Sequence, residues 1–211
     1  MDLMVLIYIK IAIICIGITI GFLKHGILTE TNRIFWIFLF SALAGEILDP
    51  LMAVYFQSNF VLYHVFRPLN YAILTIALAF DIPRLRKAYL ATIPVVFLAA
   101  YLNGIYLQPP KEVLNTIIIN LTSVLLILEV LFYIAILFEQ NNWESTIYFY
   151  SFWIALATLI YSISSFLSLG IHNFLDEAGQ DVVVLVQAYS EFVFYGAFVV
   201  NFILQKKRPA D

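Results

Sequence analysis

The sequence predicts an all-α integral membrane protein, a bundle of seven transmembrane helices, and three observations support this prediction. The chain of 211 residues is 63% hydrophobic and 12% charged, whereas soluble domains are about 45–50% apolar and about one quarter charged. Its mean hydropathy is +0.95. Seven separate windows are long enough to cross about 30 Å of hydrocarbon, which takes about 20 apolar residues in a helix.

These windows follow one another closely along the chain. They cover residues 3–23, 33–56, 60–80, 88–108, 113–138, 145–170 and 181–204. The first window lacks the basic start and the Ala-x-Ala exit of a secretory signal peptide, so we expect it to remain as a helix. Because the joins are short, we expect residues 1–211 to form a single membrane domain, with any output domain on another chain.

The Lys and Arg residues of the joins predict that the N-terminus lies outside and the C-terminus in the cytoplasm. Positive residues in short loops are retained on the cytoplasmic side. In this orientation the outer segments hold only Lys111. The cytoplasmic segments hold Lys24, Arg33, Arg84, Arg86, Lys87, Lys206, Lys207 and Arg208.

Composition and motifs argue against several classes of function. A formal net charge of -3 without a long basic run argues against nucleic acid as a partner. Cys15 is the only cysteine, so an intrachain disulfide and a thiolate metal cage are excluded. His64 is the only histidine within a window, which disfavours an intramembrane zinc hydrolase. The last window has no lysine to form a retinal Schiff base, which disfavours a rhodopsin. We expect no metal and no cofactor.

Ionisable residues inside the windows indicate where function resides. Each costs about 2.5 kcal/mol or more to insert in a bilayer, so each needs a partner, a wet cavity or a role. All except Glu129, whose role is left open, fall in the outer half of the predicted bundle. The full set is Lys10, Glu46, Asp49, His64, Arg67, Glu129 and Glu191.

Helical spacing brings these residues onto shared faces, because residues three or four apart lie on one side of a helix. The three faces are Glu46 with Asp49, His64 with Arg67 and Tyr71, and Gln187 with Glu191 and Phe194. Lys10 and Arg67 could balance part of the carboxylate charge. We therefore expect a polar, outward-facing pocket ringed by Tyr and Phe. Its expected ligand-binding residues are Lys10, Glu46, Asp49, His64, Arg67, Asn70, Gln187 and Glu191; no catalytic residue is predicted.

Structural roles compete with ligand binding at the same positions. Lys10 could extend its ammonium to the outer headgroups. Glu46 and Arg67 could form a buried ion pair that joins two helices, and His64 could be a hydrogen-bonded packing residue. Pro50 and Pro68, which directly follow Asp49 and Arg67, predict bends beside the pocket, although proline is also common in membrane helices without a binding role.

The pattern Tyr63-His64-x-x-Arg67-Pro68-x-x-Tyr71, with Glu46 in the preceding window, resembles small bacterial seven-helix membrane proteins of uncharacterised function. By layout alone, the chain is also similar to the seven-helix sensor modules found ahead of histidine kinases, although its 211 residues contain no kinase domain. The resemblance implies a helical bundle. We expect this bundle to lie in a bacterial inner membrane and, because the short joins leave any output domain to another chain, to act through a cytoplasmic signalling partner.

Three functions remain open. In the first, the outer pocket binds a small molecule or a lipid headgroup, and a shift in helix packing reaches a partner through the turn at residues 84–87. In the second, the chain is a parallel-repeat transporter, since Phe35-Trp36-Ile37 is similar to Phe152-Trp153-Ile154 and the fourth window could join two repeats of three. In the third, an intramembrane enzyme modifies lipids with a carboxylate base assisted by His64. We favour the ligand-binding protein over the enzyme.

Overall fold

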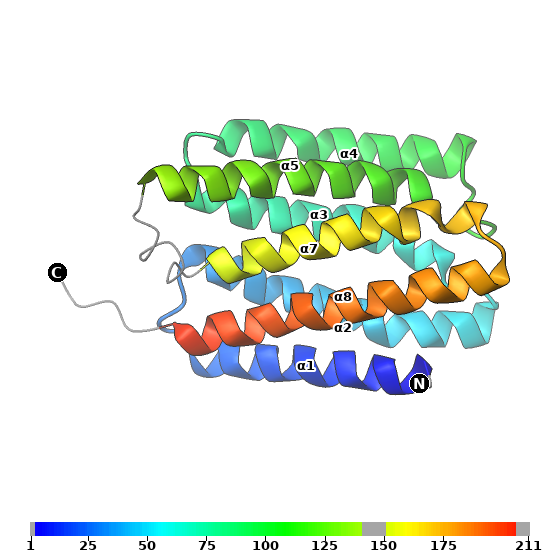
Figure 1. Ribbon diagram of the computed structural model, residues 1–211, viewed down its shortest axis with the longest axis horizontal. Helices are drawn as coiled ribbons and strands as arrows, with labels where there is room; N and C mark the ends of the chain where they lie inside the picture. The colour runs from blue at the N-terminus through cyan, green and yellow to red at the C-terminus, as the bar shows by residue number, and fades with distance from the viewer. Residues whose placement is uncertain (1–2, 141–150, 206–211) are drawn as a thin grey trace.

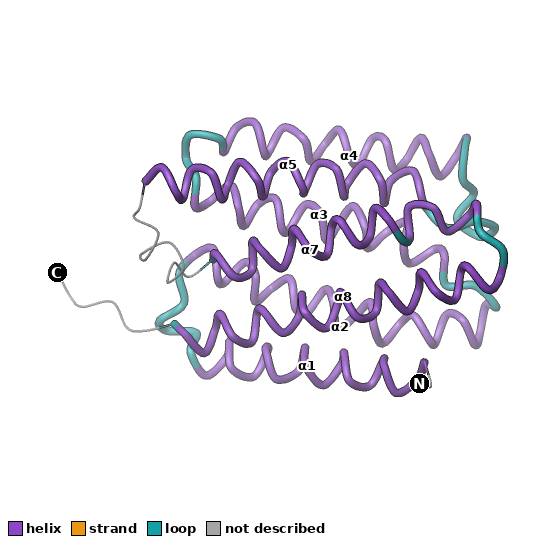
Figure 2. Tube along the Cα trace, viewed as in Figure 1, coloured by secondary structure: helices purple, strands orange, loops and turns teal. Residues whose placement is uncertain are grey.

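The computed structural model describes residues 3–140 and 151–205, and every element in this part of the chain is helical (Figures 1 and 2). The elements are α1 (Leu3–Leu23), α2 (Glu30–Phe56), α3 (Phe60–Asp81), α4 (Arg86–Tyr106), α5 (Thr116–Gln140), α7 (Phe152–Leu167), the 3₁₀ helix η1 (Leu169–Phe174) and α8 (Glu177–Leu204). Seven of the helices are long and apolar enough to cross a membrane. The predicted all-α fold with seven apolar helices is confirmed to this extent.

Two helices begin three or four residues earlier than hydropathy predicts, because polar side chains cap them. The Thr29 hydroxyl accepts a hydrogen bond from the backbone N–H of Asn32 at 3.3 Å, so α2 begins at Glu30 and not at residue 33. Asp176 accepts one from the backbone N–H of Gly179 at 2.9 Å, and α8 begins at Glu177 and not at residue 181. Such residues resemble a loop on a hydropathy scale but satisfy the free N–H groups of a helix start.

The remaining boundaries differ by a few residues from the predicted ones. Helix α4 lies two residues earlier than 88–108 at both ends, and α5 begins three residues later than 113. The window at 145–170 ends in a change of geometry, since α7 stops at Leu167 and the chain continues as η1. Residues 145–150 of this window, and Lys206, Lys207 and Arg208, lie outside the described residues.

The helices alternate in direction along the chain, so the bundle has two ends (Figure 1). At one end, here the Lys24 end, α1 and α8 finish together, and the Lys24 ammonium donates to the backbone carbonyl of Gln205 at 3.0 Å. At the other end, the Lys111 end, lie the α2–α3 turn, the α4–α5 loop and η1. Helix α1 packs against α2 and α8, and α4 packs against α3 and α5.

Helix α1 approaches α2 closely through two glycines. A Cβ atom at Gly17 would lie 2.8 Å from a methyl of Leu39, and one at Gly21 would collide with the indole of Trp36. That indole donates to the backbone carbonyl of Ile18 at 2.9 Å. A Gly-x-x-x-Gly pair on α1 leaves room for these large side chains of α2 to approach its backbone closely.

An aromatic cluster fills the core between α2 and α8. It comprises Phe35, Phe38, Phe194, Phe198 and Phe202. Phe194 also stacks on Tyr161 of α7, with ring centroids 4.6 Å apart. Because Tyr161 lines a polar cavity, the cluster closes the core on the side of that cavity facing the Lys24 end.

Candidate functional site

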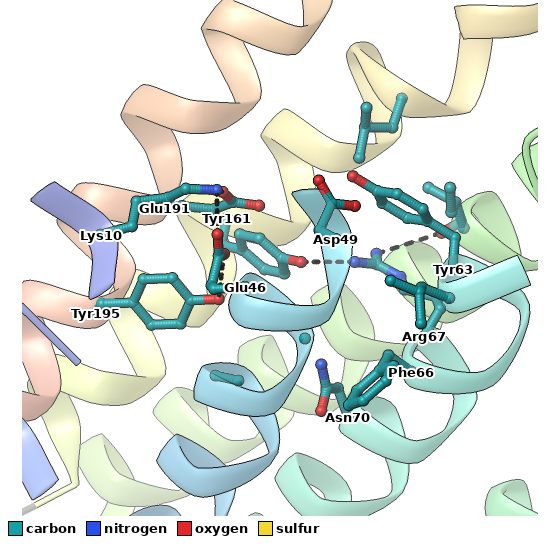
Figure 3. A pocket seen from close by; sticks show the side chains of 15 residues that line it. Lys10, Glu46, Asp49, Tyr63, Phe66, Arg67, Asn70, Tyr161, Glu191 and Tyr195 are labelled. Carbon is teal, nitrogen blue, oxygen red and sulfur yellow. Dashed lines mark hydrogen bonds and ion pairs between the residues drawn. The ribbon is translucent and has the colours of Figure 1, made fainter. Parts of the chain in front are cut away.

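A cavity of about 110 Å³ lies among α1, α2, α3, α5, α7 and α8 (Figure 3). A second cavity of about 160 Å³ adjoins it toward the Lys111 end, and Asp49, Tyr63 and Glu191 are among the residues that line both. Of the eight predicted ligand-binding residues, seven line one or both cavities. They are Lys10, Glu46, Asp49, Arg67, Asn70 and Glu191 in the first, and Gln187 in the second.

One side of the first cavity holds a triad of charges from three helices. The Lys10 ammonium of α1 lies 2.7 Å from Glu46 Oε2 of α2 and 2.8 Å from Glu191 Oε2 of α8. The three side chains are only 12–14% exposed. The triad therefore fastens α1 to both neighbours, and with all three groups ionised it carries one net negative charge.

The side-chain amide of Gln187 links the triad to α7. Gln187 Nε2 donates to Glu191 Oε1 at 3.2 Å, and Gln187 Oε1 accepts from the hydroxyls of Ser165 and Ser168 at 3.2 and 3.3 Å. The remaining oxygen of Glu46 accepts a long hydrogen bond, 3.5 Å, from the Tyr195 hydroxyl. Both glutamates are thus held in place on each of their oxygens.

Arg67 lies on the opposite side of the cavity in Figure 3. Its Nε donates to the Thr122 hydroxyl at 2.9 Å, its Nη1 to the Tyr161 hydroxyl at 2.9 Å, and its Nη2 to the Ser123 hydroxyl at 2.6 Å. The side chain is buried. Both ion pairs found among residues 3–140 and 151–205 involve Lys10. The guanidinium, expected to balance a carboxylate and weighed as a partner for Glu46, is instead held by neutral hydroxyls.

Asp49 has one oxygen bound and one oxygen open. Its Oδ1 accepts a hydrogen bond of 2.8 Å from the side-chain amide of Asn59, the residue directly before α3. Its Oδ2 makes no hydrogen bond within the described part of the chain, and neither does the Tyr63 hydroxyl. Asp49 lies between the triad and Arg67 in Figure 3, with the Tyr63 hydroxyl near it.

His64 is the one predicted site residue that lines neither cavity. Its ring Nε2 lies 3.4 Å from the carbonyl oxygen of Val113, and its Nδ1 lies beside Gly104. Tyr63, one position earlier, shares the cavity face of α3 with Arg67. His64 is therefore not placed to assist a carboxylate base in either cavity, and the histidine that lines the second cavity is His172.

Further polar groups lie between the cavity and the Lys24 end. A small cavity of about 20 Å³, enough for about one water molecule, is bordered by Arg67, Asn70 and Tyr71. Beyond it, Glu129 is buried and accepts hydrogen bonds from the hydroxyls of Tyr71 and Thr75, both at 2.7 Å, and of Thr92 at 3.2 Å.

Asp81 forms a second carboxylate cluster that the sequence did not reveal. It is the last residue of α3, and it accepts hydrogen bonds from Thr31, from Tyr133 at 2.8 Å and from Ser151 at 2.7 Å. Hydropathy assigned residue 81 to a loop, although it closes a helix in contact with three others.

The predicted ring of aromatic residues around the pocket consists of Tyr63, Phe66, Tyr161 and Tyr195. Spacing could have identified Tyr63 and Tyr195, which lie four residues from Arg67 and Glu191. Nothing in the sequence distinguishes Tyr161 from other aromatic residues.

The polar groups of this site offer charge pairing and hydrogen bonds. Within residues 3–140 and 151–205, no group of three or more His, Cys, Asp or Glu side chains is arranged to hold a metal ion. Comparison of the chain with protein-family models, with curated proteins and with solved structures finds no match.

Proposed function

We propose that this chain is a multi-pass protein of the bacterial inner membrane, N-terminus outside, whose polar cavity binds a small molecule or a lipid headgroup in order to sense it. Large apolar side chains on the outside of the bundle support insertion; Phe22, Val54 and Tyr55, for example, are 71–76% exposed. In lipid such a surface carries no penalty, whereas in water it would drive aggregation. The Lys and Arg residues gathered at the Lys24 end support the proposed orientation.

One observation carries the ligand-binding proposal. Arg67 has no carboxylate within 4 Å among the described residues, and Asp49 has an open oxygen, yet both line the same cavity. Because buried charges are costly, a purely structural cluster is expected to pair its charges internally. Two opposite charges left facing a cavity are the arrangement that a polar ligand completes.

The positions of the cavity residues in the helices support the sensing proposal. The Lys10 triad joins α1, α2 and α8, so a ligand that contacts it changes the balance of forces among three helices. Helix α3 carries Arg67 and leads at the Lys24 end into a basic turn formed by Arg84 and the first residues of α4, Arg86 and Lys87. In the proposed orientation, this basic turn faces the cytoplasm and contacts the signalling partner.

Native mass spectrometry with lipid analysis of the purified protein tests ligand binding. The variant Gly45→Leu adds an apolar side chain to the cavity lining and removes no charge; a Cβ at Gly45 meets only the Phe66 ring, at 3.7–3.9 Å. Gly196→Leu is the control, since no atom lies within 4 Å of a Cβ there. We expect wild type and Gly196→Leu to retain a defined molecule that Gly45→Leu loses. Equal retention by all three, or retention by none, would contradict the proposal.

A transporter is the second candidate, and the polar groups below the cavity favour it. Arg67, Tyr71 and Thr75 follow one face of α3 from the cavity to Glu129. Beyond them, Asp81 binds hydroxyls at the Lys24 end. Such a series suits passage of a solute or of protons through the bundle. Flux in proteoliposomes under a proton gradient, abolished by Glu129→Gln but not by Glu139→Gln, would favour transport over sensing.

A further inference from the structure

We infer that the ligand of this cavity carries an ammonium group and an anionic group separated by a few bonds, with the ammonium on Asp49 and the anion on Arg67. This inference rests on the proposed ligand-binding function and names the chemical class of the ligand. Two sources share this chemistry: a free amino acid or aminoalkyl phosphate, and the headgroup of a phosphatidylethanolamine lipid.

The ammonium position follows from the acceptors that remain open. Asp49 Oδ2 and the Tyr63 hydroxyl have no hydrogen-bond partner in the described residues, and both border the two cavities where these meet. An ammonium group offers three N–H donors and no acceptor. It therefore suits a site with an unoccupied carboxylate oxygen and a hydroxyl oxygen next to each other.

The anion position follows from the donors that remain open. A guanidinium has five N–H groups. The hydrogen bonds of Arg67 use four: one from Nε, one from Nη1 to Tyr161, and two from Nη2 to Ser123 and to the Ile119 carbonyl. One N–H of Nη1 remains, together with the whole positive charge, because all four acceptors are neutral.

Lys10 does not compete for the anion, since its ammonium already contacts Glu46 and Glu191. The cavity lining as a whole has three carboxylates and two cations. With all of them ionised, one negative charge is in excess. This excess attracts an amine and repels an isolated acid. We therefore expect a ligand with both groups to bind best, an amine alone to bind less well, and an acid alone to bind hardly at all.

The volume of the site sets the size of the ligand. An apolar cavity of about 150 Å³ binds benzene, so the cavity of about 110 Å³ accommodates a group of only a few non-hydrogen atoms. A longer molecule extends into the adjoining cavity of about 160 Å³. Either an amino acid or an ethanolamine phosphate headgroup satisfies this limit.

The test measures binding to the full chain with matched probes. The soluble probes are 4-aminobutyrate, phosphoethanolamine, butylamine and butyrate, and binding is followed by the rise in unfolding temperature in detergent. The lipid probes are nanodiscs of phosphatidylcholine with or without phosphatidylethanolamine, followed by native mass spectrometry. Binding of the soluble zwitterions identifies a free ligand, whereas selective retention of phosphatidylethanolamine identifies a lipid headgroup.

Two variants assign the groups to their sites. We expect Arg67→Gln to bind 4-aminobutyrate and butylamine equally, and Asp49→Asn to lose binding of both by about tenfold or more, equivalent to about 1.4 kcal/mol. Arg86→Gln and Asp181→Asn, whose side chains are exposed, are the controls and should bind as wild type does. Tyr63→Phe removes only the hydroxyl and should weaken amine binding even if an Asp49 variant fails to fold.

Several outcomes would overturn the inference. They are butyrate binding as tightly as 4-aminobutyrate, an unchanged amine preference in Asp49→Asn and Tyr63→Phe, or no binding of any probe. If wild type retains a molecule without an amine that Gly45→Leu loses, the ligand class is wrong but the ligand-binding function stands. The two proposals therefore fail separately.

Discussion

Lys10 and Glu191 are 181 positions apart in the sequence, yet the Lys10 ammonium and the Glu191 carboxylate lie 2.8 Å apart and join the first helix of the bundle to the last. Glu46 of α2 completes the triad, with its Oε2 2.7 Å from the Lys10 ammonium. This triad forms one side of the candidate ligand cavity, so its stability and the state of the cavity are connected.

Removing Lys10 should destabilise the bundle. In Lys10→Met two largely buried carboxylates lose the one ion-pair partner that they have among the described residues, and loss of one member of a buried pair typically costs about 3–5 kcal/mol. Unfolding in mixed detergent micelles measures the change. Lys111→Met, at an exposed position, should have almost no effect. Adding Glu46→Gln and Glu191→Gln to Lys10→Met should restore most of the lost stability. A triple variant as unstable as Lys10→Met would show that charge pairing is not the cause.

Glu129 should be important for folding as well as for any transport. Glu129→Ala leaves the Tyr71 and Thr75 hydroxyls without this acceptor, and each buried hydroxyl left unpaired costs about 1–3 kcal/mol. The Thr92 hydroxyl keeps the Tyr89 carbonyl as an acceptor. Tyr71→Phe removes one donor and should cost less than Glu129→Ala. Glu139→Ala on the same helix, exposed at its end, is the control for the unfolding measurement. Equal stability of the variants at 129 and 139 would contradict the hydrogen-bond assignment.

Gly170 should not tolerate alanine. A Cβ there would overlap the side chain of Asn120, which donates to the Gly170 carbonyl at 3.1 Å. Overpacking of this kind costs about 1–3 kcal/mol. Gly26→Ala, with open space around the added atom, should be neutral. The double variant Gly170→Ala with Asn120→Ala removes the overlap and should be more stable than Gly170→Ala alone, as thermal unfolding would detect.

Labelling of single cysteines tests the proposed orientation. Cys15 is first replaced by alanine, and then Lys111→Cys and Arg84→Cys are made at exposed positions of the two ends. In intact bacterial cells, a membrane-impermeant maleimide should label Lys111→Cys, whereas Arg84→Cys should be labelled only after permeabilisation. The reverse pattern would place the N-terminus in the cytoplasm and the cavity on the cytoplasmic side.

Hydropathy and helical spacing predicted the apolar helices and most residues of the cavity, because both depend only on order along the chain. Depth in the windows placed Lys10, Glu46 and Glu191 at a similar level, and they meet in the structure. The rotation of each helix about its axis depends on neighbours that the sequence does not specify. For this reason His64 was expected in the cavity that Tyr63 lines instead.

Polar residues at helix ends were the other source of error. Thr29 and Asp176 extend α2 and α8 through capping hydrogen bonds that hydropathy does not measure. Asp81 was assigned to a loop because its hydroxyl partners come from α2, α5 and the residue before α7. Partners so distant in sequence become visible only when the helices are assembled.

A high-resolution structure of the purified protein in lipid nanodiscs containing phosphatidylethanolamine would test the ligand site most directly. We predict density for a bound molecule between Asp49 and Arg67, with Lys10 still shared by Glu46 and Glu191. A direct Asp49–Arg67 ion pair across a closed, empty cavity would contradict the ligand-binding proposal and make the cluster structural.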